Sequence, residues 1–336
     1  MNNQDRILLA HGDGGILTHK LIQELFHKYF TFPDLAQLTD ATWVTGADSL
    51  ALTTDSFVVS PLFFPGGDIG KLAVTGTVND LTVSGAEPKY LTTAFILEEG
   101  LELATLERVV ASMAATAEAA GVSIVTGDTK VVERGRGDGI YINTTGVGLK
   151  NSLHSLGYHN IQPGDQILIN GTVGDHGTTI MAQRANITFS DGLTSDCTPL
   201  NGLISGLMST FGPALKFMRD PTRGGVATTI KEIALATGLD LRLQEAAIPV
   251  HPATRGLTEL LGLDPLYLAN EGKVIIIAAP DQTPIILDFM RQRPEGQAAA
   301  LIGEVRLGNG KVLLQTPLGG TRLIDMLYGT PLPRIC

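Results

Sequence analysis

The chain has 336 residues, of which 43% are hydrophobic and 17% charged, and its net charge is −10. This length exceeds one ordinary hydrophobic core, so two domains are expected, and the composition excludes disorder over most of the chain. The acidic balance argues against a nucleic-acid partner, because phosphate backbones are bound by basic surfaces. No apolar run approaches the roughly 20 residues that cross a bilayer, and the polar N-terminus and two cysteines predict a cytoplasmic protein without a membrane part.

The first half of the chain predicts one α+β domain. After the glycine-rich segment 11–15, apolar residues from Ile16 to Phe30 recur at helical spacing. Further elements are strands over 50–60, 90–97, 123–125 and 140–149, and helices over 69–78 and 103–120. Asp68 is the expected N-cap of the first of these helices, and Gly121 is expected to end the second. We expect residues 1–36 to form an N-terminal segment and residues 37–150 to form the domain.

The second half predicts an α/β domain followed by a tail. The polar stretch 151–165 contains glycine and proline and is typical of a linker, so the domain is expected over 160–316. Its elements are strands at 166–170, 239–243, 274–279, 300–306 and 311–315, and helices near 199–210, 224–237 and 283–292. Residues 317–336 are expected to form a C-terminal tail.

The last residue of the chain is a cysteine. Pro331 and Pro333 favour an extended backbone, and Arg334 places a cation beside the terminal carboxylate. The thiol of Cys336 has no chain beyond it, so it can enter a narrow site as a tethered substrate. A frayed terminus with an incidental cysteine is equally compatible with this segment alone. Cys197, the other cysteine, has no metal-binding spacing and is most simply structural.

Several aspartates stand at turns or element ends, where a carboxylate is costly unless it is capped, paired or bound to metal. They are Asp55, Asp68, Asp80, Asp128 and Asp220. Magnesium takes one or two carboxylates together with phosphate oxygens, so this set predicts a magnesium–nucleotide site. For any single one of these aspartates, an N-cap or Asx turn is the simpler interpretation.

Other segments also have the composition of a binding or catalytic site. Thr222 and Arg223 stand directly before a predicted helix and suit phosphate contact, with a capping turn as the alternative. The loop glycines Gly12, Gly14 and Gly15 could present N–H groups to phosphate, although no Walker A motif is present. Glu271 precedes a strongly apolar strand and is a candidate general base, with a rim salt bridge to Lys273 as the alternative.

Together these motifs resemble a known superfamily, that of aminoimidazole ribonucleotide synthetase, selenophosphate synthetase and thiamine-monophosphate kinase. The resemblance lies in Thr53-Thr54-Asp55-Ser56, in residues 64–70 and in Asn79-Asp80-Leu81. Within this superfamily, further segments resemble the HypE family of hydrogenase expression/formation proteins: residues 11–15, 127–130, 220–225, 270–273 and Pro333-Arg334-Ile335-Cys336. Asp13 departs from the family pattern, which usually has a small residue at this place.

The resemblance implies a two-domain PurM-like fold, ATP and Mg²⁺ as ligands, and a homodimer whose N-terminal sheets join into a barrel. It implies magnesium ligation by Asp55, Asp80 and Asp220. Nucleotide contacts are implied for Asp68, Gly127, Asp128 and Thr129.

The resemblance also implies a reaction at Cys336, which would receive a carbamoyl group from HypF. ATP-dependent dehydration of the thiocarboxamide to a thiocyanate would follow, and the HypC–HypD complex would pass the cyanide to the iron of a [NiFe] hydrogenase. Glu271 and Lys130 are the expected proton carriers, in an order left open, and Lys130 could instead bind phosphate. Two alternatives remain: another ATP-dependent synthetase or kinase of the superfamily, and a scaffold that only presents the terminal thiol.

Overall fold

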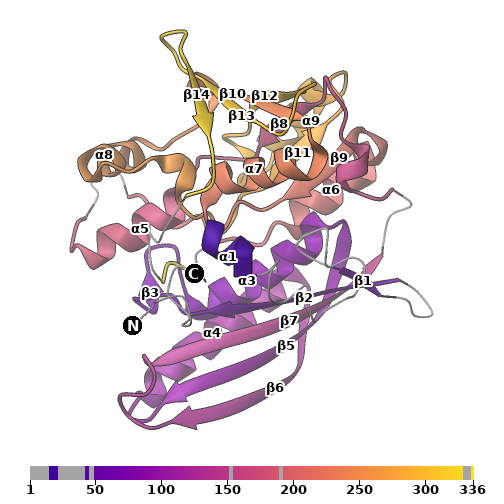
Figure 1. Cartoon of the computed structure of the whole chain (residues 1–336). Coiled ribbons are helices and arrows are strands. Elements are labelled where there is room, and N and C mark those ends of the chain that lie inside the picture. Colours follow the sequence, from indigo (N-terminus) through magenta and orange to yellow (C-terminus); the bar gives the residue numbers. More distant parts are fainter. Residues whose placement is uncertain (1–14, 22–41, 45–48, 151–153, 189–191, 328–333) are drawn as a thin grey trace.

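The computed structural model describes residues 15–21, 42–44, 49–150, 154–188, 192–327 and 334–336. Two mixed α/β domains lie against each other, and the C-terminus lies between them (Figure 1). The predicted N-terminal helix is present as α1 (Ile16–Leu21). Gly12 and Gly14 of the glycine-rich loop lie outside the described residues.

The N-terminal domain is built on a five-stranded sheet in the order β1-β2-β7-β5-β6. Its elements are β1 (Thr42–Val44), β2 (Leu50–Phe57), β3 (Phe63–Phe64), β4 (Gly67–Asp68), α3 (Ile69–Val83), β5 (Ala86–Glu98), α4 (Leu103–Ala120), β6 (Ser123–Val132) and β7 (Ile140–Lys150). Only β5 and β6 run parallel within this sheet, because α4 returns the chain between them.

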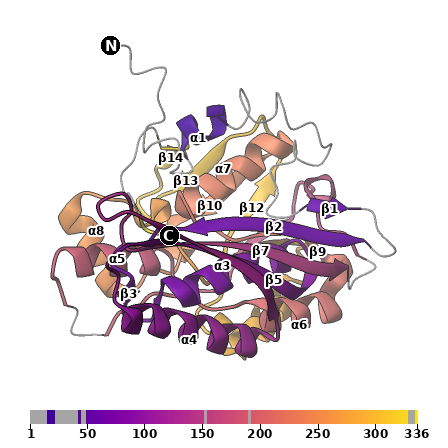
Figure 2. The ribbon, with the colours of Figure 1, turned by 90° about the horizontal axis from the view of Figure 1, so that it is seen from below.

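The two long helices cover one face of this sheet (Figures 1 and 2). Alternate residues of β7 are buried beneath them, and Ile140 and Ile142 belong to the resulting core. The predicted caps are confirmed: the Asp68 carboxylate accepts hydrogen bonds at the start of α3, and Gly121 ends α4 in the left-handed conformation. The other face of the sheet carries exposed apolar side chains, among them Tyr90 and Ile96.

The C-terminal domain is built on a seven-stranded sheet in the order β14-β13-β10-β12-β8-β11-β9. Its strands are β8 (Gln166–Ile169), β9 (Leu215–Arg219), β10 (Asp240–Gln244), β11 (Ile275–Ala278), β12 (Ala300–Arg306), β13 (Val312–Gln315) and β14 (Thr321–Ile324). Its α-helices are α5 (Asp175–Arg184), α6 (Asn201–Phe211), α7 (Gly225–Thr237), α8 (Pro252–Leu261) and α9 (Thr283–Arg291). Short 3₁₀ turns are η5 (Tyr158–Asn160), η6 (Gly212–Ala214), η7 (Glu245–Ala247), η8 (Pro265–Tyr267) and η9 (Pro294–Gly296).

Both faces of this second sheet are covered, which explains the continuous apolar run of β11. Ile275 and Ile277 pack in the core that includes α7, whereas Ile276 and Ala278 pack in the core that includes α6 and α9. A strand buried on both faces loses the apolar–polar alternation of a half-exposed strand. The fully buried strand at 274–279 therefore confirms the prediction made for it.

Some elements differ from the sequence-based expectation. The helices α5 and α8 and the strands β9 and β14 were not predicted. Strand β14 pairs with β13 at the edge of the second sheet, so residues 321–324, expected in the tail, form a sheet strand instead. The last three residues of the expected tail, 334–336, are also described, and they lie against the N-terminal domain.

Candidate active site

Glu271 is the buried acidic residue at the centre of the candidate site. It lies just before β11 and is 3% exposed, and its Oε1 atom has no hydrogen-bond partner among the described residues. Burial raises the pKa of Glu271 well above its usual value, and the carboxylates of Asp196, Asp55 and Asp220 raise it further. Arg223 acts in the opposite direction. A buried carboxyl group with a raised pKa suits proton transfer near neutral pH, as expected for a general base.

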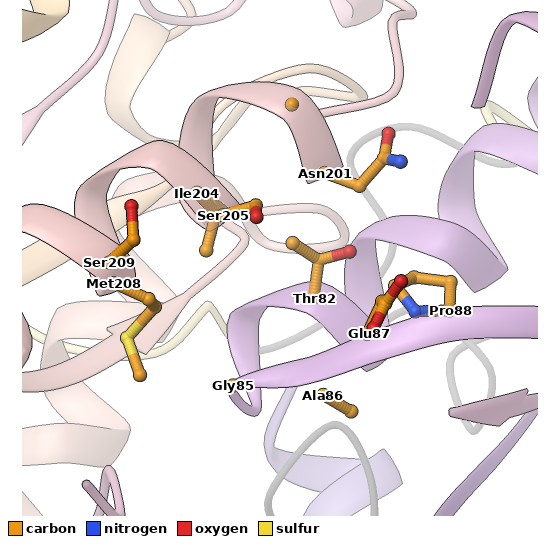
Figure 3. Close-up of a pocket in the computed structure, with 11 residues that line it drawn as sticks. Thr82, Gly85, Ala86, Glu87, Pro88, Asn201, Ile204, Ser205, Met208 and Ser209 are labelled. Carbon is orange, nitrogen blue, oxygen red and sulfur yellow. The ribbon is translucent and has the colours of Figure 1, made fainter. Parts of the chain in front are cut away.

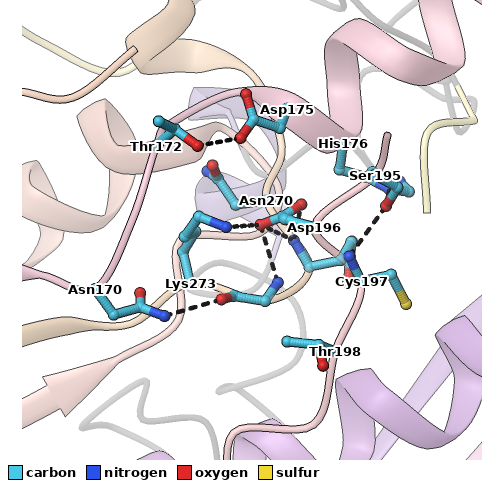
Figure 4. Close-up of polar contacts among 12 residues, drawn as sticks. Asn170, Thr172, Asp175, His176, Ser195, Asp196, Cys197, Thr198, Asn270 and Lys273 are labelled. Carbon is cyan, nitrogen blue, oxygen red and sulfur yellow. Dashed lines mark hydrogen bonds and ion pairs between the residues drawn. The ribbon is translucent and has the colours of Figure 1, made fainter. Parts of the chain in front are cut away.

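Asp196 holds the backbone of Glu271 in place, and its contact with Lys273 is drawn in Figure 4. Its carboxylate accepts hydrogen bonds from the backbone N–H groups of Glu271 and Gly272, and it pairs with Nζ of Lys273 at 2.9 Å. Burial alone would raise the pKa of Asp196, but Lys273 and the other donors lower it below its usual value. The expected alternative of a rim salt bridge between Glu271 and Lys273 is therefore wrong, because Lys273 is buried and its partner is Asp196.

Arg223 connects the acidic groups of the site to the end of the chain. The negative charge at Cys336 is the strongest influence on this guanidinium and raises the pKa of Arg223. The carboxylates of Asp55, Glu271 and Asp80 act in the same direction. The charges of the terminal residue, of two predicted magnesium ligands and of the predicted base thus all act on a single cation, which lies 3.9 Å from Asp55.

The three predicted magnesium ligands come from three different elements. Asp55 lies on β2, where burial raises its pKa and Arg223, 3.9 Å away, lowers it. Asp80 lies on α3 and accepts a hydrogen bond from Thr53 at 2.8 Å. Asp220 is buried between β9 and α7 and contributes to the field at Glu271. Within the described ranges, no three His, Cys, Asp or Glu side chains gather closely enough to hold a metal ion by themselves.

The last three residues dock beside the end of β2. A carboxylate oxygen of Cys336 and the carbonyl oxygen of Arg334 accept hydrogen bonds from the backbone N–H groups of Val58 and Ser60, at 3.2 and 3.3 Å. Ile335 is buried in the N-terminal core, and Cys336 packs against the same core. The terminal residue therefore lies at the junction of the two domains, and its charge acts on Arg223 of the candidate site.

A second group of predicted residues lies elsewhere in the same chain. Gly127, Asp128, Thr129 and Lys130 are on β6, which two strands separate from β2 in the sheet order, or about 14 Å at the usual strand spacing. The strand register aligns Gly127 with Asp55 across the sheet, so Asp128 and Lys130 project from the opposite face. These two side chains are exposed and pair with each other at 2.7 Å. The side chain of Thr129 lies outside the described part of the chain.

The remaining predicted nucleotide contacts occupy element ends. Asp68 caps α3 by accepting the backbone N–H groups of Gly70 and Lys71, as the simpler interpretation of this residue expects. Gly15 is buried at the start of α1. Thr222 lies in the turn before α7, where its carbonyl accepts the N–H of Gly225. Each of these contacts lies within the protein itself. Nucleotide binding by Asp68, Gly15 and Thr222 stays a prediction.

Two polar residues of the site were not expected from the sequence. His176 is fully buried in the first turn of α5, and its two ring nitrogens contact Ser195 Oγ and the carbonyl of Ile335, each at 2.8 Å. The sequence offers only a weak signal for this histidine, namely its position between Asp175 and Gly177 at a helix start. Ser195 gives no signal in the sequence.

A separate hollow lies where the end of α3 meets α6 (Figure 3). It has a volume of about 390 Å³ and is lined by Thr82, Gly85, Ala86, Glu87, Pro88, Asn201, Gly202, Ile204, Ser205, Met208 and Ser209. None of the predicted site residues lines it.

Among the described helices, none combines the length and the apolar character needed to cross a membrane.

Comparison with known proteins agrees with this two-domain geometry. The model of the N-terminal domain of AIR synthase related proteins matches residues 38–150, and the model of the C-terminal domain matches residues 162–314. Thiamine monophosphate kinase from Aquifex aeolicus, at 18% identity and a TM-score of 0.67, shares the fold. These matches define a PurM-like, AIR synthase-related protein.

More similar relatives narrow the class. The carbamoyl dehydratase HypE of Rhodobacter capsulatus is 48% identical over 99% of this chain and 98% of its own length. That of Escherichia coli K12 is 48% identical over the full length of both chains. A crystal structure of HypE in complex with ATP has a TM-score of 0.83 at 47% identity, covering 98% of this chain and all of that chain. The chain belongs to the HypE family.

Proposed function

We propose that this chain is an ATP-dependent carbamoyl dehydratase that acts on its own C-terminal cysteine during [NiFe] hydrogenase maturation. A carbamoyl group carried on Sγ of Cys336 is dehydrated to a thiocyanate, which supplies a cyanide ligand of the active-site iron. The observation that supports the proposal is the docking of Cys336 at the domain junction, where its charge and that of the buried Glu271, whose Oε1 has no partner among the described residues, both act on Arg223. A scaffold that only presents a thiol does not need a buried carboxyl group at this place.

The site fits ATP together with Mg²⁺. Asp55, Asp80 and Asp220 offer the oxygen donors that magnesium prefers, although they form no closed set by themselves in the described residues. Such an open set suits a cation that arrives with a nucleotide, because phosphate oxygens and water complete its coordination. When bound, the nucleotide supplies a phosphoryl group that turns the amide oxygen of the thiocarboxamide into a good leaving group.

The residues of the cleft have distinct roles in this proposal. Arg223 neutralises negative charge next to the docked tail and to the incoming phosphates. Two protons must leave the amide nitrogen while the carbon–nitrogen triple bond forms and phosphate departs. Glu271 takes up one of these protons, because burial among carboxylates makes it a stronger base than an ordinary carboxylate.

A homodimer accounts for the residues on β6. Asp128 and Lys130 lie on the uncovered face of the N-terminal sheet, and exposed Tyr90 and Ile96 lie on the same face. A second copy that closes this face into a barrel buries the apolar side chains and brings Lys130 towards the nucleotide of the dimer. In this arrangement Lys130 either binds phosphate as a point charge or carries the second proton.

HypF and the HypC–HypD complex are the proposed partners before and after the reaction. A crystal structure of a HypE–HypF complex, with a TM-score of 0.87 at 45% identity to this chain, supports the first of them. The match to that complex covers 91% of this chain and 99% of the chain it was compared with. In this proposal, the tail is undocked when Cys336 is carbamoylated and when the cyano group is passed on. The dehydration between these two steps takes place while the tail is docked.

Modification-dependent ATP turnover tests the proposal. Hydrolysis of ATP is measured for the chain with unmodified Cys336, for the carbamoylated chain and for Cys336→Ser treated in the same way. We expect one phosphate per loaded chain and only slow release from the other two samples. Equal turnover in all three samples, or a carbamoyl group that persists with excess Mg²⁺ and ATP, contradicts the proposal.

A further inference from the structure

The docked tail is held through its backbone and through the Arg334 side chain, which donates to the Val58 carbonyl and pairs with Asp138. The carbonyl oxygens of Arg334 and Ile335 and a carboxylate oxygen of Cys336 each accept a hydrogen bond, and the donors belong to Ser60, His176 and Val58 respectively. The Ile335 side chain is 5% exposed and fills a place in the N-terminal core. These bonds do not use the Sγ atom of Cys336, so a cargo on this atom leaves the docking bonds intact.

The middle bond of the three comes from a buried histidine whose tautomer is set by its neighbours. The backbone N–H of Cys197 donates to Ser195 Oγ at 3.1 Å, and Ser195 Oγ lies 2.8 Å from His176 Nδ1. The carbonyl of Ile335 can only accept, so Nε2 of His176 carries the proton and Nδ1 accepts from the Ser195 hydroxyl. Three hydrogen bonds therefore run in one direction, from Cys197 to the tail.

The surroundings of His176 keep this arrangement in place. Burial lowers the pKa of His176 and favours the neutral ring, although Asp196 acts in the opposite direction. The Phe64 ring meets the imidazole edge-on, with 5.4 Å between ring centroids. At the other end of α5, Arg184 donates to the Arg334 carbonyl and, at 2.7 Å, to the Ser60 carbonyl. Helix α5 thus contacts the tail at its first turn and at its last residue.

We propose that His176, oriented by Ser195, is a positioning residue that reads the tail backbone at Ile335 and sets the depth to which Cys336 enters the cleft. The functional reason for this docking, namely the placement of Cys336 for dehydration, rests on the dehydratase function proposed above. The docking contacts themselves do not depend on that function.

The hydrogen bonds that lead to the tail and those that hold Glu271 start from neighbouring residues. Ser195 orients His176, and the next residue, Asp196, holds the backbone of Glu271 (Figure 4). One three-residue segment, 195–197, therefore supports both the docked tail and the backbone of Glu271.

A matched pair of variants separates the tail bond from the rest of the histidine. In His176→Asn, the amide reaches only as far as Nδ1, so the contact with Ser195 is kept and the donor to Ile335 is lost. In His176→Gln, the amide nitrogen takes the place of Nε2, so the donor to Ile335 is kept. Both variants are uncharged and polar, and both remove the aromatic contact with Phe64.

Alkylation of Cys336 by iodoacetamide, followed by mass spectrometry of the C-terminal peptide, measures the undocked fraction without HypF or ATP. Cys197 is an internal reference, because it is 2% exposed and reacts only when the fold opens. Loss of one hydrogen bond predicts a two- to tenfold faster alkylation of Cys336 in His176→Asn, with about the wild-type rate in His176→Gln. If His176→Asn also exposes Cys197, Ser195→Ala replaces it, with the same increase expected.

Equal Cys336 alkylation rates in the Asn and Gln variants, with Cys197 protected, overturn the proposal. Single-turnover dehydration of the carbamoylated chain then tests the link to function. The dehydration rate should fall in His176→Asn in proportion to the docked fraction that remains, should not fall in His176→Gln, and the ATP dissociation constant should not change in either variant. A tail that undocks in His176→Asn without slower dehydration contradicts the proposed function and leaves the positioning role standing.

Discussion

Replacement of Asp196 by asparagine should destabilise the fold by about 3–5 kcal/mol, the usual cost of removing one partner of a buried ion pair. The carboxylate is buried and accepts three donors, with distances of 2.9 Å to Lys273 Nζ and 3.1 and 3.2 Å to the backbone N–H groups of Gly272 and Glu271. Lys273 is only 8% exposed, so the variant leaves its charge buried without compensation. An asparagine oxygen cannot serve all three donors.

Urea unfolding at pH 7 measures this loss, with Lys273→Met and the double variant as controls. The double variant has no unpaired buried charge, so it should be more stable than the sum of the single effects predicts, by at least about 1 kcal/mol. Neighbouring cations hold the pKa of Asp196 below its usual value, so its stabilising effect is complete at neutral pH and is lost as the pH falls through that lowered pKa. A loss below about 1 kcal/mol for Asp196→Asn, or strictly additive variants, would refute this reasoning.

Three further predictions concern the base, the dimer face and the terminal thiol. Glu271→Gln should abolish dehydration yet raise the free energy of unfolding at neutral pH. The raised pKa of Glu271 means that ionising it destabilises the folded state at any pH above the ordinary pKa of glutamate, and glutamine removes this cost. The gain in stability, about 1.4 kcal/mol per unit of pKa shift, should vanish near pH 3. Ile96→Glu should convert the proposed homodimer to a monomer in light scattering, with Leu307→Glu on an exposed loop as the control, and an unchanged mass would count against the proposed barrel. Cys336→Ser should bind ATP with wild-type affinity in calorimetry and accept no carbamoyl group, and a large loss of affinity would place the thiol in the nucleotide site.

Much of the fold follows from patterns that act locally. Asp68 and Gly121 cap helices α3 and α4 as expected, because capping depends on a few neighbouring residues. Helix α5 was missed because it begins with Asp175, His176 and Gly177, followed by two threonines, and has no regular apolar stripe. It forms because these polar residues find partners elsewhere in the fold, such as Thr254 for Asp175.

The site was predictable only in part for the same reason. Asp55, Asp80 and Glu271 stand out because carboxylates at strand and helix positions need compensation. His176 gains its meaning from a hydrogen bond to a residue 159 positions away, which no local pattern contains. Lys130 stands out in the sequence, but the sheet register decides which face it occupies, and that face is opposite to Asp55.

Mass spectrometry of the C-terminal peptide most directly tests the central claim that this cleft dehydrates a cargo on Cys336. The chain is carbamoylated with HypF, carbamoyl phosphate and ATP, separated from nucleotide, and then incubated with or without Mg²⁺ and ATP. We predict a carbamoyl mass on Cys336 that loses one water only when Mg²⁺ and ATP are added. A carbamoyl mass that never loses water, or a modification on a residue other than Cys336, would contradict the account.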